Sequence, residues 1–568
     1  MINGRLYFQA WLVAVVALIV AFLTLEPPGE PVRTDQVATF NSQEAVDTAS
    51  DLAAAAPARA PGSPGAEAAA AWIEQRFKDL SGDGHGVATQ TMVARVDGKR
   101  IPLRNVFFTL PAAAPTRSQR NIVIIAPRDA PSGVAGGTTS SAILVELART
   151  AIRTSYRHTI IFLSVDGGTI GNAGTRWYLR SVDRTRIAGI VVLDAPGEGD
   201  GRVIPIWSSG AGRQSLAMRQ LADQAVRTAG YQPTGLPSLR DQLLRFAVPE
   251  TRGEQRAAID LGIPAVTLAN RDESTLPAGP VIITRERVDG AGTAALWLVN
   301  LLDAQERANA PDAALAYAGK ILRPAVARLA LLLLALPLLI MALDAAARVR
   351  RGRIRVSAGL RTVAWRFVTP LAVLFLAYLL STWGIFRGPD IGRPPKVADL
   401  HLDGQAWLGM LLLALVSAVV WLWVRPRVLA TRVNPPAEAT AALIWLAGLT
   451  LLAWWVAPFS LVLILPAAHA ALAATVVQRQ WQVGALAVVA LAGPIAVVLI
   501  VAGDIDRNPL FAVWYLCETS VSGARGFVGP VLAATVGVCV VSLGKLVAFR
   551  VRKGLVAGRV PGAVRTPR

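Results

Sequence analysis

Eight long apolar stretches constrain this chain more than any other feature of its sequence. The hydrocarbon core of a bilayer is about 30 Å thick, and a helix of roughly 20 apolar residues crosses it. One stretch stands near the amino terminus, and the other seven lie in the second half of the chain. They cover residues 6–25, 329–347, 367–385, 406–424, 440–457, 459–477, 483–502 and 531–549. The sequence therefore predicts a multi-pass membrane protein with eight helical spans.

The amino-acid composition favours the same class of protein. Hydrophobic residues make up 53% of the 568 residues and charged residues 17%, and the mean hydropathy is +0.45. Soluble domains carry roughly a quarter charged residues, so disorder, a coiled coil and an ordinary cytosolic enzyme are disfavoured. The two cysteines, Cys517 and Cys539, are too few for a disulfide framework or a thiolate metal site.

The first apolar stretch follows Arg5 and could be a cleaved signal peptide or an uncleaved signal anchor. Its apolar run is longer than the hydrophobic region of a usual signal peptide. Residues 23–28 also lack the small-x-small pattern of a cleavage site. We therefore expect an uncleaved signal-anchor helix within residues 1–28, and cleavage is the alternative.

Basic residues in the short loops predict the orientation of the spans, because cytoplasmic loops carry an excess of Lys and Arg. The segments 348–361, 425–432 and 550–568 are rich in Arg, whereas 386–403 and 504–525 balance the two signs. One assignment satisfies every loop: both termini are cytoplasmic and the region between the first two spans lies outside. The formal net charge of +19 then reflects topology and attraction to anionic lipid at the cytoplasmic face, and nucleic-acid binding is disfavoured.

The region between the first two spans is long enough for a globular domain. Apolar runs such as 121–126 and 159–165 alternate with helical patterns, and two strands are expected at 88–96 and 101–110 around Asp97-Gly98. Strands that are apolar throughout are typical of a sheet buried on both faces, so we expect an α/β fold. The predicted organisation is a signal-anchor helix (1–28), a linker (29–65), the α/β domain (66–310), a linker (311–328), a seven-helix transmembrane domain (329–549) and a basic cytoplasmic tail (550–568).

Seven short segments of this region form an ordered set. They are RAPGS at 59–63, NVFF at 105–108, IVIIAPRD at 122–129, LVELAR at 144–149, IFLSVDG at 161–167, VVLD at 191–194 and GIPAV at 262–266. In this order they resemble the di-zinc aminopeptidase family (the aminopeptidase S and Y type of peptidase clan MH). The resemblance implies a mixed sheet sandwiched by helices. It also implies a site after the carboxyl ends of the strands, where two zinc ions would activate a bridging water.

The positions that hold zinc and the general base in that family carry other residues here. The replaced segments read PRD at 127–129, GGTTSS at 136–141, GT at 168–169 in place of paired glutamates, and GEQ at 253–255. The final histidine is also absent around 268–273. The resemblance therefore implies a catalytically inactive relative without metal or other cofactor.

A few residues of the ancestral site are expected to remain as a vestigial pocket. Asp194 falls on a ligand position, and Asp129 on a position that orients a ligand. Arg128 would add a positive charge that disfavours a metal cation. The vestigial pocket is therefore expected to contain Arg128, Asp129, Gly168, Thr169 and Asp194.

The remaining chemistry-bearing residues offer weaker alternatives. None of the four histidines is expected at the pocket: His158 precedes a strand, His469 lies within a span, and His85 and His401 lie in loops. Asp129, Asp166 and Asp194 could instead form an acid/base group or be solvated loop carboxylates. Finally, Ser140 and Ser141 fit helix caps better than nucleophiles.

The order of the parts supports a second resemblance. One amino-terminal span, a peptidase-like domain without its zinc ligands, and seven further spans resemble the attachment subunit of eukaryotic GPI transamidase, a scaffold that presents substrate to a separate catalytic subunit. Few lysines beside abundant Arg, Ala and Val indicate a GC-rich bacterial genome, so we expect a bacterial plasma membrane. A bacterium is not expected to make GPI anchors, so the resemblance does not imply a GPI lipid as the substrate of this protein.

The leading hypothesis is a catalytically inactive scaffold or substrate-presenting subunit. Its outer domain would bind a polypeptide or partner protein, and its helical bundle would bind a membrane lipid or lipid-linked substrate. Two rivals stay open. One is an active metallo-aminopeptidase or amide-forming enzyme with a rearranged site, and the other is a transporter or flippase with an accessory domain.

Overall fold

The structure is a computed structural model that describes most of the chain. The described residues are 3–27, 29–35, 39–81, 86–96, 99–114, 119–130, 137–199, 201–247, 253–273, 282–352, 356–383, 385, 404–429, 435–473, 480–504 and 507–521. The expected span at 531–549, the tail at 550–568, His85, His401 and Cys539 lie outside the described residues.

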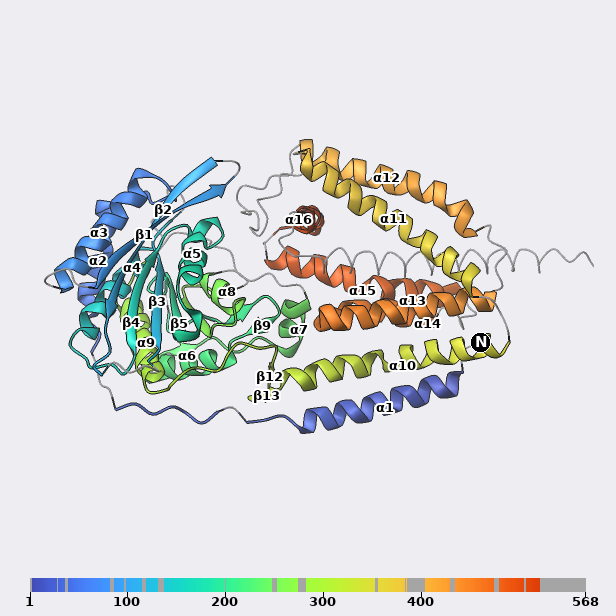
Figure 1. The fold of residues 1–568 in the computed structure, drawn as a ribbon, viewed down its shortest axis with the longest axis horizontal. Coiled ribbons are helices and arrows are strands. Elements are labelled where there is room, and N and C mark those ends of the chain that lie inside the picture. The colour runs from blue at the N-terminus through green and yellow to red at the C-terminus, as the bar shows by residue number, and fades with distance from the viewer. Residues whose placement is uncertain are drawn as a thin grey trace, which may run out of the picture.

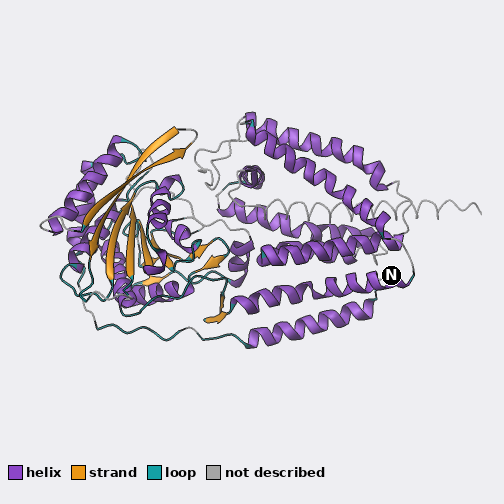
Figure 2. Ribbon diagram, in the orientation of Figure 1, coloured by secondary structure: helices purple, strands orange, loops and turns teal. Residues whose placement is uncertain are grey.

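The chain forms an α/β domain at one end and a bundle of long helices at the other (Figures 1 and 2). The domain is built on a seven-stranded sheet with the order β1-β2-β4-β3-β5-β11-β7. Strands β4, β3, β5 and β11 are parallel, whereas β1, β2 and β7 join antiparallel, so the sheet is mixed as expected. The strands are β1 (Val87–Val96), β2 (Lys99–Leu110), β3 (Asn121–Pro127), β4 (Thr159–Val165), β5 (Ile187–Asp194), β7 (Ile206–Trp207) and β11 (Ala265–Ala269).

Both faces of the sheet are covered by helices, which explains why its strands are apolar throughout. Successive strand residues point to opposite faces. Ile122 and Ile124 of β3 therefore pack into one core, and Val123 and Ile125 pack into the other. The first core includes α2 (Ser42–Ala55), α3 (Pro64–Ser81), α4 (Thr138–Ala151), α6 (Leu216–Thr228) and α9 (Arg285–Asp303), and the second includes α5 (Ala173–Ser181) and α8 (Glu254–Ile259).

Two segments that the sequence predicts as linkers carry secondary structure. Helix α2 lies inside the expected linker 29–65, begins at an Asn41 cap and places Ala45 in the first core. The expected linker 311–328 contains a short hairpin of β12 (Leu315–Tyr317) and β13 (Lys320–Leu322). The α2 segment is rich in small residues, and it gains stability by packing on α4 and α9, which its composition does not reveal.

The helical bundle agrees in part with the expected spans. Among the described residues, six helices, not eight, are long and apolar enough to cross a membrane. The expected stretch 459–477 forms only a shorter apolar helix in its described part, because a 3₁₀ turn at Pro458–Ser460 precedes α14 and the described helix ends at Ala473. The six are α1 (Gly4–Leu23), α10 (Pro324–Arg351), and the apolar parts of α11 (Ser357–Thr382), α12 (Gly404–Leu429), α13 (Pro435–Val456) and α15 (Gln480–Asp504).

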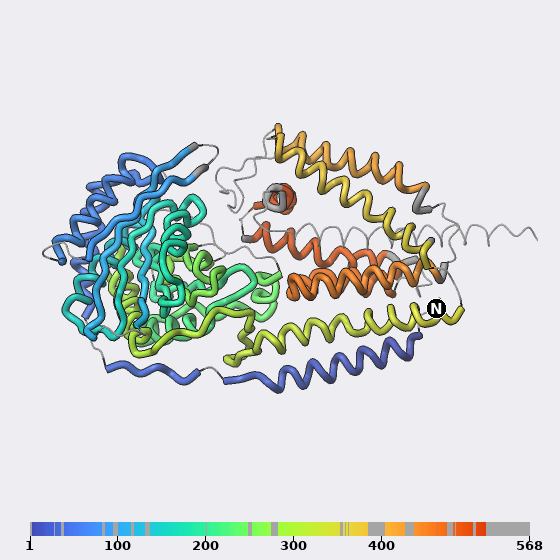
Figure 3. Tube along the Cα trace, in the orientation of Figure 1, coloured from blue at the N-terminus to red at the C-terminus, as the bar shows by residue number. Residues whose placement is uncertain are grey.

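The amino-terminal helix is joined to the rest of the bundle. Helix α1 lies beside α10 in the tube view (Figure 3). The Tyr7 hydroxyl lies 3.3 Å from Nδ1 of His469 on α14, and Nε2 of that ring lies 3.2 Å from the carbonyl oxygen of Leu334 on α10. His469, which was expected within a span, is thus bonded at both ring nitrogens and ties three helices together.

Candidate functional site

The carboxyl ends of the parallel strands meet at one edge of the sheet, and the polar residues that follow them form the candidate site. Asp129 follows β3, Gly168 and Thr169 follow β4, and Asp194 ends β5. Asn270 and Arg271 follow β11. Four separate loops therefore supply this site, and only the order of the strands brings them together.

The carboxylate of Asp129 is bonded to the segment that replaces the paired glutamates. Its oxygens accept the backbone N–H of Gly168 at 2.9 Å, the N–H of Thr169 at 2.8 Å and the Thr169 hydroxyl at 2.7 Å. A Cβ at position 168 would lie 2.8 Å from Oε1 of Glu254 and 3.0 Å from Oδ1 of Asp129. A side chain at this position would therefore have to displace the carboxylates of Glu254 and Asp129.

Arg128 lies next to Asp129 in sequence, but its side chain is fully buried in a different network. Its guanidinium donates to the carbonyl oxygens of Ser164, at 3.1 Å, and of Arg104, and it pairs with Asp166 at 3.6 Å. Burial raises the pKa of Asp166, and the charge of Arg128 opposes that rise. Asp166 therefore belongs to this buried ion pair, while Asp129 faces the loop after β4.

Two glutamates join the site that the sequence did not single out. Glu254, at the start of α8, is 3% exposed, and neither of its carboxylate oxygens has a hydrogen-bond partner. Burial raises the pKa of Glu254 to about 8, and a hydrogen-bonding interaction with the Thr175 hydroxyl is the largest opposing effect. The charges of Asp129 and Asp194 add to the rise, and the charge of Arg176 lowers it. Its position is therefore set by packing, and its charge is held among other acids.

Glu198 is the second glutamate of this site. Its Oε1 accepts the N–H of Gly137 at 2.7 Å, and its Oε2 lies 3.4 Å from the amide nitrogen of Asn270. Burial raises the pKa of Glu198 to about 7 despite these bonds, and the charge of Asp194 adds to the rise. Nothing in the immediate sequence of Glu198 marks its burial.

Asp129, Asp194, Glu198 and Glu254 are therefore called the carboxylate cluster. Asp194 is half-buried, and burial raises its pKa while the charge of Arg271 lowers it. Besides Arg271, three arginines among the described residues lie close to the cluster. Arg59 is buried and donates to the carbonyl oxygens of Arg128 and Ala56 at 2.8 and 2.7 Å, the charge of Arg128 interacts with that of Asp129, and the charge of Arg176 lowers the pKa of Glu254. The four acidic side chains therefore share the site with four arginines, and the raised pKa values of Glu198 and Glu254 reduce their negative charge near neutral pH.

The donor set of this site does not fit a dinuclear zinc centre. Among the residues that the structure describes, no three His, Cys, Asp or Glu side chains converge as metal ligands. Both oxygens of Asp129 already accept hydrogen bonds. His158 lies at the opposite edge of the sheet, where Nδ1 is 3.2 Å from Asp303, and His469 lies in the bundle.

The two serines near the site differ in their contacts. Helix α4 begins at Thr138 after an uncapped Gly137, so neither Ser140 nor Ser141 is the expected helix cap. The Ser140 hydroxyl instead accepts the N–H of Ala195 at 2.7 Å, which ties α4 to the end of β5. The Ser141 hydroxyl is buried without a hydrogen-bond partner.

No family model and no curated protein matches the chain. Solved structures similar to about half of it include a glutaminyl cyclase from an Acidobacteriales bacterium, with 19% identity over 49% of this chain and 99% of that chain and a TM-score of 0.38. A zinc aminopeptidase from Bacillus subtilis matches with 12% identity over 46% and 95% of the two chains and a TM-score of 0.40. A putative zinc-dependent exopeptidase from Bacteroides vulgatus has 16% identity, 47% and 99% coverage and a TM-score of 0.36. Similarity at this level identifies no activity for this chain.

Proposed function

We propose that this protein is a catalytically inactive, peptidase-like membrane scaffold. Its α/β domain binds a polypeptide without cleaving it, and its helical bundle spans a bilayer and holds a lipid or lipid-linked substrate. The observation that carries the proposal is the bonding of Asp129 by Gly168 and Thr169, which fill the place of the paired glutamates. Where the resemblance places a general base and a metal ligand, Gly168 and Thr169 supply no carboxylate.

The carboxylate cluster supports binding of an organic cation. Four acidic side chains gather at this edge of the sheet, and neither oxygen of the buried Glu254 meets the geometry of a hydrogen bond within the described residues. An ammonium group supplies several N–H donors and a positive charge in one small group. The amino terminus of a polypeptide carries such a group, with an ordinary pKa near 8, and it is the ligand chemistry that fits this cluster best.

The proposed setting follows from the distribution of basic residues. With both termini in the cytoplasm, the α/β domain lies on the opposite side of a bacterial plasma membrane, and the Arg-rich loops attract anionic lipid at the cytoplasmic face. A separate enzyme then acts on the polypeptide that this domain presents. The layout resembles that of the GPI transamidase attachment subunit, without its lipid.

Peptide binding to the purified full-length protein tests this function. A fluorescent peptide with a free amino terminus should bind at least tenfold more tightly than the same peptide acetylated, and should stay intact. Asp194→Asn should abolish that difference, whereas Asp183→Asn, at an exposed carboxylate near the opposite edge of the sheet, should leave it unchanged. Two bound zinc ions per chain with chelator-sensitive hydrolysis of the peptide would overturn the proposal and favour the enzyme.

A further inference from the structure

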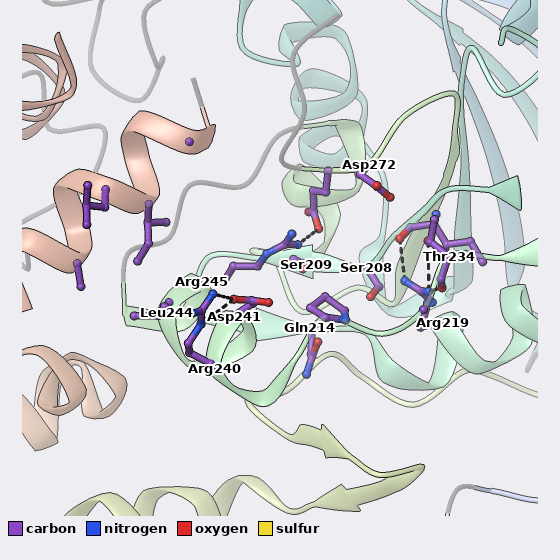
Figure 4. Close-up of a pocket in the computed structure, with 18 residues that line it drawn as sticks. Ser208, Ser209, Gln214, Arg219, Thr234, Arg240, Asp241, Leu244, Arg245 and Asp272 are labelled. Atoms are coloured by element: carbon purple, nitrogen blue, oxygen red, sulfur yellow. Dashed lines mark hydrogen bonds and ion pairs between the residues drawn. The ribbon is translucent and has the colours of Figure 1, made fainter. Parts of the chain in front are cut away.

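A cavity of about 770 Å³ lies between the α/β domain and the helical bundle, away from the carboxylate cluster (Figure 4). Its size is within the range of small-molecule sites, which is roughly 300–1,000 Å³. Fourteen of its eighteen lining residues come from the domain, ten of them polar, and the other four come from helix α15. No described residue of the carboxylate cluster lines it.

The bundle side of the cavity is a single apolar face of α15. Ala496, Leu499, Ile500 and Gly503 line it, and their spacing of three, four and seven residues places them on one side of the helix. Leu499 is 56% exposed, so this face is not filled by neighbouring helices. Gly503 is one residue from the end of α15, so the apolar face reaches the end of the helix that lies against the domain.

The helix α7 (Leu239–Ala247) forms part of the domain side of the cavity. Arg240, Asp241 and Arg245 line the cavity from one side of this helix. On its other side, Phe246 packs edge-on against Phe459 of the 3₁₀ turn before α14, with ring centroids 4.8 Å apart. That contact fixes α7 between the two parts of the protein and holds its charged side over the end of α15.

The charges that line the cavity balance. Arg219, Arg240 and Arg245 face Asp241, Asp272 and Glu273. Arg245 pairs with Glu273 at 2.6 Å and Arg240 with Asp241 at 3.2 Å, and the Arg240 side chain is 82% exposed. A purely anionic ligand would meet three carboxylates here, and a purely cationic one would meet three guanidinium groups. A ligand that carries both charges close together fits both sets.

We propose that this cavity binds the headgroup of an amine-bearing zwitterionic phospholipid, with one acyl chain along the apolar face of α15. The phosphate lies between Arg240 and Arg245, and the ammonium lies against the carboxylates of Asp241 and Glu273. The inference rests on the proposed function, in which the bundle spans a bilayer and holds a lipid. A soluble zwitterion would leave the α15 face without a partner, so a lipid accounts for both walls of the cavity.

Lipid retention by the full-length protein, measured by native mass spectrometry, tests this proposal. The protein is exchanged into detergent with equimolar phosphatidylethanolamine, phosphatidylglycerol and phosphatidylcholine. We expect the first to be retained at least fivefold over each of the others. Equal retention, a preference for another of the three headgroups, or no retained lipid would overturn the proposal.

Two variants test whether the retained lipid contacts both walls of the cavity, the charged side of α7 and the apolar face of α15. Arg240→Gln removes the exposed cation, leaves the buried Arg245–Glu273 pair intact and should lower retention about tenfold. Leu499→Trp fills the apolar wall without changing a charge and should do the same. Arg186→Gln, at an exposed arginine near the opposite edge of the sheet, is the matched control and should have no effect. Retention that is unaffected by both cavity variants would also overturn the proposal.

Two further measurements separate this inference from the proposed function. Free glycerophosphoethanolamine should compete at least a hundredfold more weakly than the lipid, and equal competition would refute the role of the α15 face. The peptide-binding assay is performed on the same preparations. If the peptide binds but the protein shows no headgroup preference, the proposed lipid site is wrong and the proposed scaffold function is retained. If the protein prefers the headgroup but does not bind the peptide, only the proposed polypeptide binding is wrong.

Discussion

Each edge of the parallel sheet holds a buried carboxylate, and the two carboxylates differ in their hydrogen bonds. At the edge where the strands begin, Asp303 is 1% exposed and accepts the backbone N–H groups of Arg157 and His158 at 2.9 and 2.8 Å. At the edge where the strands end, Glu254 is 3% exposed and both of its oxygens have no hydrogen-bond partner. The two side chains differ little in burial and entirely in their bonding.

Their pKa values follow this difference. Burial acts to raise the pKa of Asp303, but the hydrogen bonds from His158 and Arg157 outweigh it and hold the pKa below its ordinary value. Burial raises the pKa of Glu254 to about 8. Unsatisfied buried polar groups are rare because they destabilise the fold, and they concentrate at functional sites. The comparison therefore separates a well-bonded carboxylate at the first edge from a poorly bonded one at the second, which is the edge of the candidate site.

The largest expected effect is the pH dependence that Glu254 adds to stability. Its folded-state pKa of about 8 exceeds the ordinary 4.5, so the unfolded state loses this proton first and stability falls as pH rises from about 4.5 to 8. At about 1.4 kcal/mol per unit, the loss is about 5 kcal/mol. Glu254→Gln should remove it. The thermal midpoint of the variant should exceed that of the wild type by about 10 °C at pH 9 and match it near pH 5.

Glu198 supplies the control for this pH series. It also titrates with a raised pKa, of about 7, but it accepts a hydrogen bond from Gly137. The difference between wild type and Glu254→Gln should therefore keep growing above pH 7, where Glu198 is already ionised in both. A difference that stays constant from pH 5 to pH 9 would show that Glu254 is not held as described, and the contrast between the two edges would fail.

The second prediction concerns Asp303, at the edge where the strands begin. Asp303→Ala leaves the N–H groups of Arg157 and His158 buried without an acceptor, and should lower the free energy of unfolding by about 3 kcal/mol at pH 7. Because the pKa of Asp303 is lowered on folding, its contribution is present above the unfolded-state value and is lost as pH falls through the folded-state value. Denaturant titrations at pH 7 and pH 3 should therefore show a smaller difference from wild type in acid. Peptide binding should be unchanged, and a loss of binding in a folded variant would contradict the structural role.

The third effect compares two aspartates with similar bonds in different surroundings. Asp129 accepts the N–H and hydroxyl of Thr169 within the cluster, and Asp183 accepts the N–H and hydroxyl of Thr185 on an exposed turn. Asp129→Asn should cost about 2 kcal/mol and should lower affinity for the free amino terminus, whereas Asp183→Asn should leave both stability and affinity nearly unchanged. Equal losses of affinity in the two variants would show that the effect is not local to the cluster.

The fold was predictable to the extent that it depends on local pattern. The apolar run 121–126 predicts β3 almost to the residue, because a strand buried on both faces needs apolar side chains at every position. Helix α2 was missed because its small residues show little pattern without the surface of α4 on which they pack. Its Asn41 cap, which accepts the N–H of Glu44, is the signal that could have predicted it.

The site was predictable only where a family resemblance aligned separate loops. Asp129, Gly168 and Thr169 were expected in one place for that reason, and the structure joins them by hydrogen bonds. The same reasoning expected Arg128 in the pocket, but its side chain lies in the buried pair with Asp166, because neighbours along an extended chain point to opposite sides. The segment 253–255 was aligned with the site, but Glu254 itself was not expected there, because its burial depends on the packing of α8 against β5 and β11.

The smallest effect distinguishes two adjacent serines at the functional edge. Ser140 accepts the N–H of Ala195, which has a positive φ of 52°, so Ser140→Ala should lower stability by about 1 kcal/mol. The Ser141 hydroxyl is buried without a partner, so Ser141→Ala should be neutral or slightly stabilising. Thermal midpoints of the two variants, measured side by side, compare a satisfied and an unsatisfied hydroxyl one residue apart. If the order is reversed, the pattern of bonding at this edge is not the cause of its low stability, and the same doubt then extends to Glu254.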